Sequence, residues 1–367
     1  MDKTEKMLQD VCERFCIEGT LTSYEEIKLG NINRTFRVDY TEENGEVKSY
    51  MVQAVNTYVF KNPVQVMENI DKVTSHLREK NPDRTTLHFY HTKENKTYYF
   101  EGDGFWRVFN FIPSTTYNVC DDLNVVYNAG KEFGEFQMTL ADFDVSLLFD
   151  TIPDFHNTRK RYETMIAHAK EDAFGKLDDV RDDYEYLVSV QDKACKMTDM
   201  LNEGKLPLRV THNDTKINNV LFEKDSCNTL TVIDLDTVMP GLVGHDFGDA
   251  IRFAGNFVEE DSKEADKAGI NMDVFRAFAE GFLSRTATTL TEEELATLAH
   301  GCFVLTCEQA VRFLDDYIQG SPYFKINYPE HNLVRTRCQV ALAKDIEKHL
   351  DQMEQIVREC AARFKQA

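Results

Sequence analysis

The chain has no long apolar run, and its basic residues are outnumbered by acidic ones. No stretch approaches the roughly eighteen uninterrupted apolar residues that a membrane-spanning helix needs, so we expect no such helix. Lys and Arg number 42 against 63 Asp and Glu, which gives a net charge of -21. Because such a surface repels polyanions, we expect neither nucleic acid nor an anionic membrane as a partner.

Several short motifs of common sites are also absent. The nine cysteines include no C-x-x-C pair, and Met1 to Lys6 lack the basic and apolar segments of a signal peptide. These features predict a cytoplasmic protein whose cysteines are free thiols. Neither G-x-G-x-x-G nor G-x-x-x-x-G-K-[ST] occurs, which argues against Rossmann and P-loop folds.

Hydrophobic periodicity predicts an α+β fold with two lobes of unequal size. Residues 1–113 combine a helix near 3–16, a helix from Pro63 to about Arg78, and period-two strands at 36–40, 50–55, 98–101 and 105–111. Residues 114–367 are mostly helical, with a β-like block at 208–239. The expected helices there span about 121–140, 156–172, 178–203, 272–286, 291–319 and 331–365.

This order of elements is typical of a bilobal, protein-kinase-like fold. We expect a small N-terminal nucleotide-binding lobe built on a β-sheet with helices, and a large, mostly helical C-terminal catalytic lobe. The hinge is expected near residues 109–114. A nucleotide would bind in the crevice between the lobes, where ligand sites commonly form.

The run Val210–Asn219 carries the most informative motif, with the spacing H-x-D-x-K-x-x-N. Phosphoryl transfer from a nucleotide needs a carboxylate that positions the acceptor hydroxyl and oxygen ligands that hold magnesium on the phosphates. We predict that Asp214 is the catalytic base and that Lys216 stabilises charge on the transferred group. His212 is expected to brace the loop by hydrogen bonding.

Two residues are predicted to hold Mg²⁺. Asn219 lies five positions after Asp214, although its neighbour Asn218 has the same chemistry and only the spacing separates them. Asp234 ends the apolar strand Leu230–Ile233, and Asp236 is a second possible ligand. Asp246-Phe247-Gly248 spells the magnesium tripeptide of protein kinases but follows a glycine-rich loop. We therefore expect Asp246 and Asp249 to cap a helix that begins near Ala250 and to brace the site.

The N-terminal half supplies the predicted nucleotide contacts. The turn that includes Gly30, Asn31, Asn33 and Thr35 has residues that tolerate the backbone shapes needed to point amides at phosphates. Gln53 occupies the strand position where a kinase usually has its phosphate-binding lysine. A neutral amide supplies no charge, so magnesium and Lys216 would have to compensate. Asn110 and Phe111, at the expected hinge, complete this set.

These motifs resemble those of the N-acetylhexosamine 1-kinases, a branch of the aminoglycoside phosphotransferase-like kinases. The matching segments are Gly30–Asn33, Trp106–Val108, Arg209–Asn219, Val232–Gly241, Asp246–Phe253, Arg312–Tyr317, Tyr323–Phe324 and Tyr328–Arg337. The resemblance implies MgATP-dependent phosphorylation of the anomeric hydroxyl of N-acetylglucosamine or N-acetylgalactosamine. It also implies that Arg312 and Tyr323 contact the sugar together with Asp214, and that glutamine is tolerated at position 53.

Two other classes of function stay open from the sequence. One is a related small-molecule kinase, for choline, homoserine, methylthioribose or an aminoglycoside, because the core motif does not distinguish among these acceptors. The other is a pseudokinase that binds nucleotide without transferring phosphate. Asp214, Lys216, Asn219 and Asp234 are all present, which favours an active enzyme.

Overall fold

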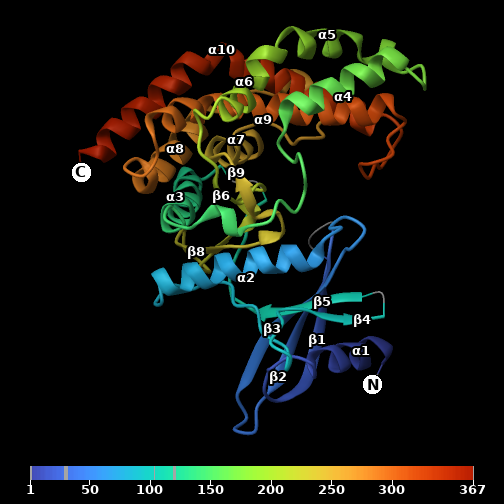
Figure 1. Ribbon diagram of the computed structural model, residues 1–367, viewed down its shortest axis with the longest axis vertical. Helices are drawn as coiled ribbons and strands as arrows, with labels where there is room; N and C mark the ends of the chain where they lie inside the picture. Colours follow the sequence, from blue (N-terminus) through green and yellow to red (C-terminus); the bar gives the residue numbers. More distant parts are fainter. Residues whose placement is uncertain (1, 29–31, 103, 119–120, 367) are drawn as a thin grey trace.

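The computed structural model describes residues 2–28, 32–102, 104–118 and 121–366 (Figure 1). Its N-terminal part is a five-stranded antiparallel sheet in the order β1-β2-β3-β5-β4. The strands are β1 (Thr20–Ile27), β2 (Arg34–Thr41), β3 (Val47–Val55), β4 (Tyr99–Glu101) and β5 (Gly104–Asn110). Two helices accompany the sheet, α1 (Lys3–Cys12) and α2 (Pro63–Lys80).

The alternation in β2 separates the two faces of this sheet. Phe36, Val38 and Tyr40 are buried in a small core with α1, which also contains Leu8 and Val11. Period-two alternation sends the intervening residues of β2 to the opposite face. The sheet therefore has an apolar face against α1 and a second face that contributes polar residues to the site.

The larger C-terminal part is mostly helical and contains two small antiparallel sheets, β6–β9 and β7–β8. The helices are α3 (Leu123–Thr139), α4 (Thr158–Glu171), α5 (Arg181–Ser189), α6 (Gln191–Asn202), α7 (Val243–Ala254), α8 (Met272–Thr286), α9 (Glu292–Ile318) and α10 (His331–Lys365). The strands are β6 (Arg209–Thr211), β7 (Val220–Phe222), β8 (Thr229–Val232) and β9 (Met239–Gly241). The α+β class predicted from the sequence is confirmed.

Two predicted helix bounds were wrong. The helix expected over 178–203 is two helices, because the backbone leaves the helical conformation at Val190 between α5 and α6. Helix α7 begins at Val243 rather than near Ala250, so Asp246 and Asp249 lie inside it and do not cap it. The glycines of this segment suggested a loop, but they serve helix packing. A Cβ on Gly248 would lie 2.3 Å from the carbonyl oxygen of Gly301 in α9.

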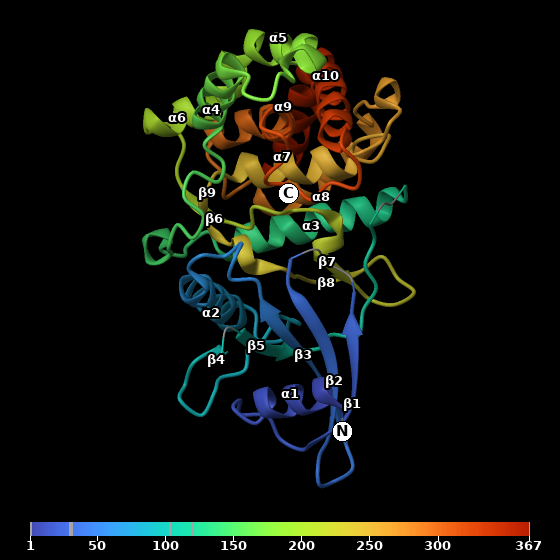
Figure 2. The same ribbon diagram turned by 90° about the vertical axis from the view of Figure 1, so that its right-hand side faces the viewer.

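Helix α2 lies between the sheet and the helical part, as Figures 1 and 2 both show. Its Asn69 is completely buried, donates hydrogen bonds to the carbonyl oxygens of Phe149 (2.8 Å) and Val238 (2.9 Å), and accepts one from the Phe149 N–H (2.9 Å). Apolar residues of α2, among them Val66 and Ile70, belong to the same core as the C-terminal helices. This helix therefore joins the two parts of the molecule.

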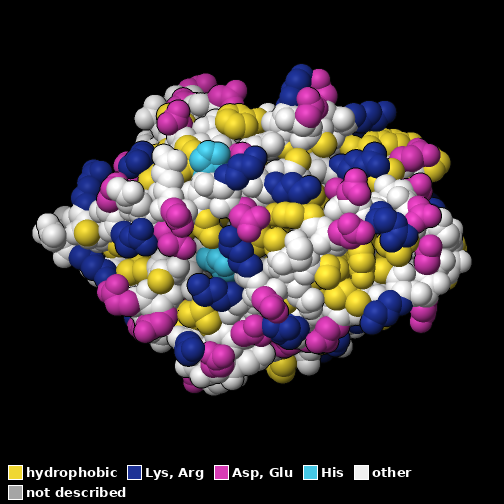
Figure 3. Space-filling model, turned by 90° about the horizontal axis from the view of Figure 1, so that it is seen from above, with side chains coloured by type: hydrophobic (Ala, Val, Ile, Leu, Met, Phe, Trp, Pro, Cys, Tyr) yellow, Lys and Arg dark blue, Asp and Glu magenta, His cyan; other side chains and the backbone are white. Residues whose placement is uncertain are grey.

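The surface carries both signs of charge. Seen from the side of the C-terminal helices, acidic and basic side chains are interspersed rather than gathered into one field (Figure 3). Among the described residues, no helix is both long enough and apolar enough to cross a membrane.

Candidate active site

The hairpin formed by β7 and β8 brings Asn219 and Asp234 together. Val220 pairs with Val232, and the N–H of Ile233 donates to the carbonyl oxygen of Asn219 at 2.9 Å. Asp234 follows directly, with a left-handed backbone (φ 59°) that turns the chain away from the strand. The two residues predicted to bind magnesium therefore lie beside each other in the fold, although 15 positions separate them.

Asp214 is held between Lys216 and Asn219. The Lys216 ammonium lies 2.9 Å from Asp214 Oδ1, and the Asn219 amide nitrogen donates to Asp214 Oδ2 (3.1 Å) and to its carbonyl oxygen (2.8 Å). Because the Asn219 nitrogen makes both bonds, the amide oxygen is the atom left to ligate a metal. The predicted base, cation and metal ligand thus share one short loop.

Asp246 is hydrogen-bonded to the backbone just before Asp214. Its carboxylate accepts hydrogen bonds from the backbone N–H groups of His212 (2.9 Å) and Asn213 (2.8 Å) and from the side chain of Gln137 (2.9 Å). Asp246 is only 2% exposed, and burial raises the pKa of its carboxyl group. These contacts match the bracing role expected from the sequence. The position of Asp246 within α7 corrects the capping role.

His212 also has a bracing role. Its Nε2 lies 2.8 Å from the carbonyl oxygen of Ile233, and its Nδ1 accepts from the Asp214 N–H at 3.3 Å. His212 thus ties the loop that carries Asp214 to the segment that leads into Asp234, as its expected role required.

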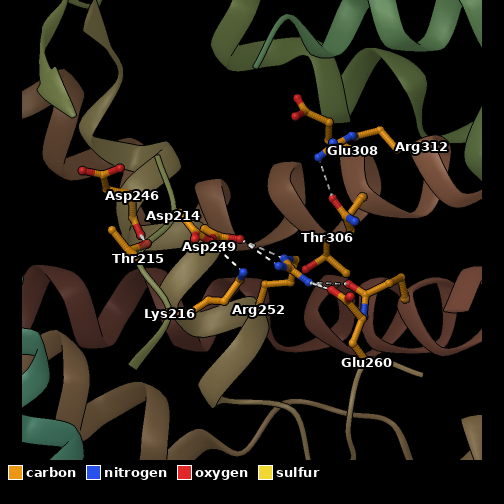
Figure 4. A network of polar contacts seen from close by, with 12 residues as sticks. Asp214, Thr215, Lys216, Asp246, Asp249, Arg252, Glu260, Thr306, Glu308 and Arg312 are labelled. Atoms are coloured by element: carbon orange, nitrogen blue, oxygen red, sulfur yellow. Dashed lines mark hydrogen bonds and ion pairs between the residues drawn. The ribbon is translucent and has the colours of Figure 1, made fainter. Parts of the chain in front are cut away.

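A line of alternating charges runs from this loop into the helical core (Figure 4). Asp249 lies 2.9 Å from Arg252, which also forms an ion pair with Glu260. Burial alone would lower the pKa of Lys216, but Asp214 and Asp249 outweigh it and raise that pKa. Lys216 is therefore a protonated cation at neutral pH, as its predicted role requires.

The carboxylate chemistry of Asp234 fits a divalent cation. Burial, the nearby Asp236 and Asp214 together raise the pKa of Asp234 to about 6, against the opposing effects of Arg107 and His212. Such crowding of negative charge is relieved by a bound cation, and a carboxylate with an amide oxygen is a suitable hard ligand pair for Mg²⁺. No cluster of three acidic, histidine or cysteine ligands occurs among the described residues, so waters and phosphates would have to complete the coordination.

Asp236 is already engaged and is a poor second ligand. Its Oδ1 forms an ion pair with Arg107 at 2.5 Å, and its Oδ2 accepts from the Asn33 amide nitrogen at 2.7 Å. Both carboxylate oxygens are therefore bound to the N-terminal lobe. The sequence left Asp236 open as a metal ligand, and these contacts favour Asp234.

The structure brings several predicted nucleotide contacts to one face of the sheet. The Gln53 amide nitrogen donates to Thr35 Oγ1 at 2.8 Å, and Asn33 contacts Asp236. Gly30 and Asn31 lie outside the described residues. These contacts place Asn33, Thr35 and Gln53 next to the segment that follows Asp234.

The predicted hinge residues are placed differently. The side chain of Asn110 accepts from the N–H of His88 (2.7 Å) and donates to the carbonyl oxygen of Thr86 (3.2 Å). The ring of Phe111 lies under the guanidinium of Arg37 at 4.5 Å. Both side chains thus serve the fold, so any contact of Asn110 and Phe111 with a nucleotide would come from their backbone.

Arg312 and Tyr323 line one cavity of about 450 Å³ within the C-terminal lobe. Its walls come from α4, α9 and the loop after α9. Besides these two, the lining residues are Pro153, Asp154, Lys160, Arg161, Thr164, His168, Val311, Asp315, Asp316, Gln319, Pro322 and Phe324. Asp214 is not among them. Arg312 lies beyond Arg252 and Glu308, away from Asp214 (Figure 4).

Comparison with known proteins agrees with this geometry. The model of the phosphotransferase enzyme family (APH) matches residues 23–279, which is more than half of the chain. The chain belongs to this family. The match includes the segment with Asp214, Asn219 and Asp234, so the residues that the fold brings together lie within the family's own region.

Solved structures of phosphotransferases share the fold. Spectinomycin phosphotransferase APH(9)-Ia, in complex with ADP and spectinomycin, has a TM-score of 0.58 at 13% identity, with 95% of this chain and 98% of that chain covered. Choline kinase from Cryptosporidium parvum Iowa II gives 0.58 at 13% identity, covering 97% and 99%. Amicoumacin kinase hAmiN, solved with AMP-PNP and Ca²⁺, gives 0.55 at 12% identity, covering 98% and 94%. At these identities the likeness shows the protein-kinase-like fold alone.

The contacts of Arg107 were not predicted from the sequence. Arg107 of β5 lies opposite Gln53 of β3, and its guanidinium reaches Asp236 across the lobes. Arg107 belongs to the matching segment Trp106–Val108, but no role was assigned to it. A signal existed, because an arginine with apolar neighbours inside a strand must find a partner if it is buried.

Proposed function

We propose that this phosphotransferase transfers the γ-phosphate of MgATP to the anomeric hydroxyl of an N-acetylhexosamine. Asp214 would align and deprotonate the hydroxyl, Lys216 would stabilise the transferred phosphoryl group, and Asn219 with Asp234 would hold Mg²⁺. The ion held by these two residues would offset the negative charge of the phosphates. An anomeric hydroxyl is more acidic than an ordinary alcohol, so a modest carboxylate base is sufficient.

The charge of the cavity around Arg312 is the observation that supports a neutral sugar over a cationic acceptor. Each aspartate on its wall already has a partner. Asp154 pairs with Lys160, Asp315 lies 2.7 Å from His168, and Asp316 accepts hydrogen bonds from the backbone N–H groups of the loop after α9. Two of these three aspartates are therefore paired with basic side chains, and the carboxylate oxygens of Asp316 are occupied by N–H donors.

The two arginines of the cavity lack such partners. Across the described chain, neither Arg161 nor Arg312 forms an ion pair with a carboxylate, and Arg161 Nε is buried without a hydrogen-bond partner. Arg312 donates only to the neutral side chain of Gln309, at 2.9 Å. Burial and the neighbouring Arg161 lower the pKa of Arg312. The nearby Glu308 is itself bound to His156 and Thr158.

Two guanidinium groups without a direct ion pair disfavour a cationic acceptor beside them and attract hydrogen-bond acceptors. Choline, ethanolamine and aminoglycosides are cations, whereas an N-acetylhexosamine offers hydroxyl and acetamide oxygens. The resemblance of the 312–337 region to the N-acetylhexosamine 1-kinases then favours the amino sugar among neutral acceptors. The exposed ring of Tyr323 and the adjacent Phe324 provide an aromatic rim to the same cavity.

A coupled assay of ADP release would test this proposal. The purified protein is given MgATP with N-acetylglucosamine, N-acetylgalactosamine, glucose, choline or kanamycin, and the product is identified by ³¹P NMR. We expect turnover of an N-acetylhexosamine to its 1-phosphate and no turnover of the cations. Turnover of choline or kanamycin in preference to the sugars would contradict the proposal, and ATP binding without any turnover would support a pseudokinase.

Variants of the arginines at and near the cavity would test whether the cavity binds the acceptor. Arg312→Ala should raise the KM for the sugar about tenfold to a hundredfold, because a hydrogen bond to a charged group is lost, and should leave the KM for ATP unchanged. Arg159→Met is the matched control, since Arg159 lies on α4 next to this wall but pairs with Asp199 instead. Equal effects of the two variants on the sugar KM would remove Arg312 from the acceptor site.

A further inference from the structure

Arg107 is a buried cation that contacts Asp236, two residues after the proposed metal ligand Asp234. It stands on β5 in register with Gln53 on β3, and only 3% of its surface is exposed. Burial of a guanidinium is costly unless its donors are satisfied and its charge is balanced. Its surroundings therefore indicate what the charge is used for.

Two neighbours fix the orientation of the guanidinium. Nε and Nη2 both donate to Gln53 Oε1, at 2.8 and 2.5 Å, and Nη1 donates to Asp236 Oδ1. Gln53 is itself held by Thr35, and Asp236 by Asn33. Arg107 is thus tied both to the strand position of the missing lysine and to the turn region expected to cover the phosphates.

Arg107 offsets part of the negative charge of the aspartates in and near the proposed metal site. Asp214, Asp234 and Asp236 contribute three negative charges when ionised, while Lys216 and Arg107 contribute two positive charges, which leaves one negative charge before any metal binds. Without Arg107, a polyphosphate would meet two uncompensated carboxylates in a chain of net charge -21.

We propose that Arg107, rather than Gln53, supplies the positive charge of the nucleotide phosphate subsite. Gln53 and Asp236 position its guanidinium, so Asp236 is its counter-ion and not a metal ligand. The charge that kinases usually carry on a lysine of the third strand here comes from the neighbouring strand. Nη2 retains an N–H for a phosphate oxygen, since only one of its two hydrogens is needed for the bond to Gln53.

This inference rests on the proposed use of ATP, and nucleotide binding without acceptor separates the two. Isothermal titration would measure the affinities of adenosine, AMP, ADP and ATP, with Mg²⁺ present, for the wild type, Arg107→Met and Arg107→Lys. We expect Arg107→Met to weaken ADP and ATP about tenfold to a hundredfold, because a charge-assisted contact is lost, and adenosine by less than about threefold. Arg107→Lys should recover most of the ADP and ATP affinity.

Arg159→Met again controls for the loss of an arginine ion pair elsewhere. A wild type that binds none of these nucleotides would refute the proposed function. If the wild type binds nucleotides and Arg107→Met lowers the affinity for adenosine as much as the affinity for ATP, Arg107 has only a structural role and the inference fails.

Asp236→Asn keeps Arg107 and gives an independent answer if Arg107→Met does not fold. The asparagine oxygen can still accept from Arg107, so we expect ADP affinity to fall by less than about threefold, and equally with and without Mg²⁺. A tenfold or greater loss of MgADP affinity in Asp236→Asn, confined to titrations with Mg²⁺, would make Asp236 a metal ligand and overturn the assignment.

Discussion

Replacing Asp246 should destabilise the protein rather than remove a metal. Asp246→Ala leaves two buried backbone N–H groups, of His212 and Asn213, and the amide of Gln137 without their acceptor. Each such loss costs about 1–3 kcal/mol, while removal of a buried carboxylate recovers part of that cost. The expected loss is about 2–5 kcal/mol of unfolding free energy.

Urea unfolding followed by circular dichroism measures this change, and titration of Mg²⁺ on the folded variant measures metal affinity. The control is Asp142→Ala, because the side chain of Asp142 is 60% exposed and solvent screens its ion pair with Lys80. We expect kcat to fall in Asp246→Ala, since the loop with Asp214 loses its support. Unchanged stability together with lost Mg²⁺ affinity would show that Asp246 is a ligand and that the bracing argument is wrong.

Two further predictions concern the metal site and helix packing. Magnesium binds the ionised form of Asp234, whose pKa is raised to about 6. In titrations without nucleotide, the affinity for Mg²⁺ or Mn²⁺ should therefore be full above pH 7 and fall about tenfold by pH 5. Equal affinity at both pH values would contradict this. Gly248→Ala should destabilise the fold by at least about 1–3 kcal/mol in thermal or urea melts, because its Cβ would lie 2.3 Å from the Gly301 carbonyl oxygen. Ala254→Ser, on the same helix, is the control. If Gly248→Ala unfolded at the same point as the wild type, the close packing would be contradicted.

Local patterns were sufficient to predict much of the fold and the catalytic loop. Period-two and helical alternation predicted the order of most elements, because each pattern reflects which face of an element is buried, but β1 was not predicted. The spacing of Asp214 and Asn219 is short enough for one loop to hold both. The apolar strand expected to end at Asp234 corresponds to β8, and its pairing with β7 places Asp234 beside Asn219.

Contacts between distant segments were beyond the reach of these patterns. Arg107 meets Gln53 because β3 and β5 are neighbours in the sheet, although α2 and β4 lie between them in the sequence. The cavity around Arg161 and Arg312 joins two helices that are about 150 residues apart. Glycines in α7 resembled a loop because the sequence does not show that Gly301 packs against them. Each of these features depends on tertiary packing rather than on local preference.

The docking of α2 constrains how nucleotide can enter and leave. Asn69 and the apolar face of α2 share one core with the C-terminal helices, and Val55 of β3 and Phe105 of β5 belong to that core as well. Domain opening that moved α2 with the sheet would have to expose that shared core to water. Exchange of nucleotide is therefore expected to proceed without a wide separation of the sheet and α2 from the C-terminal helices.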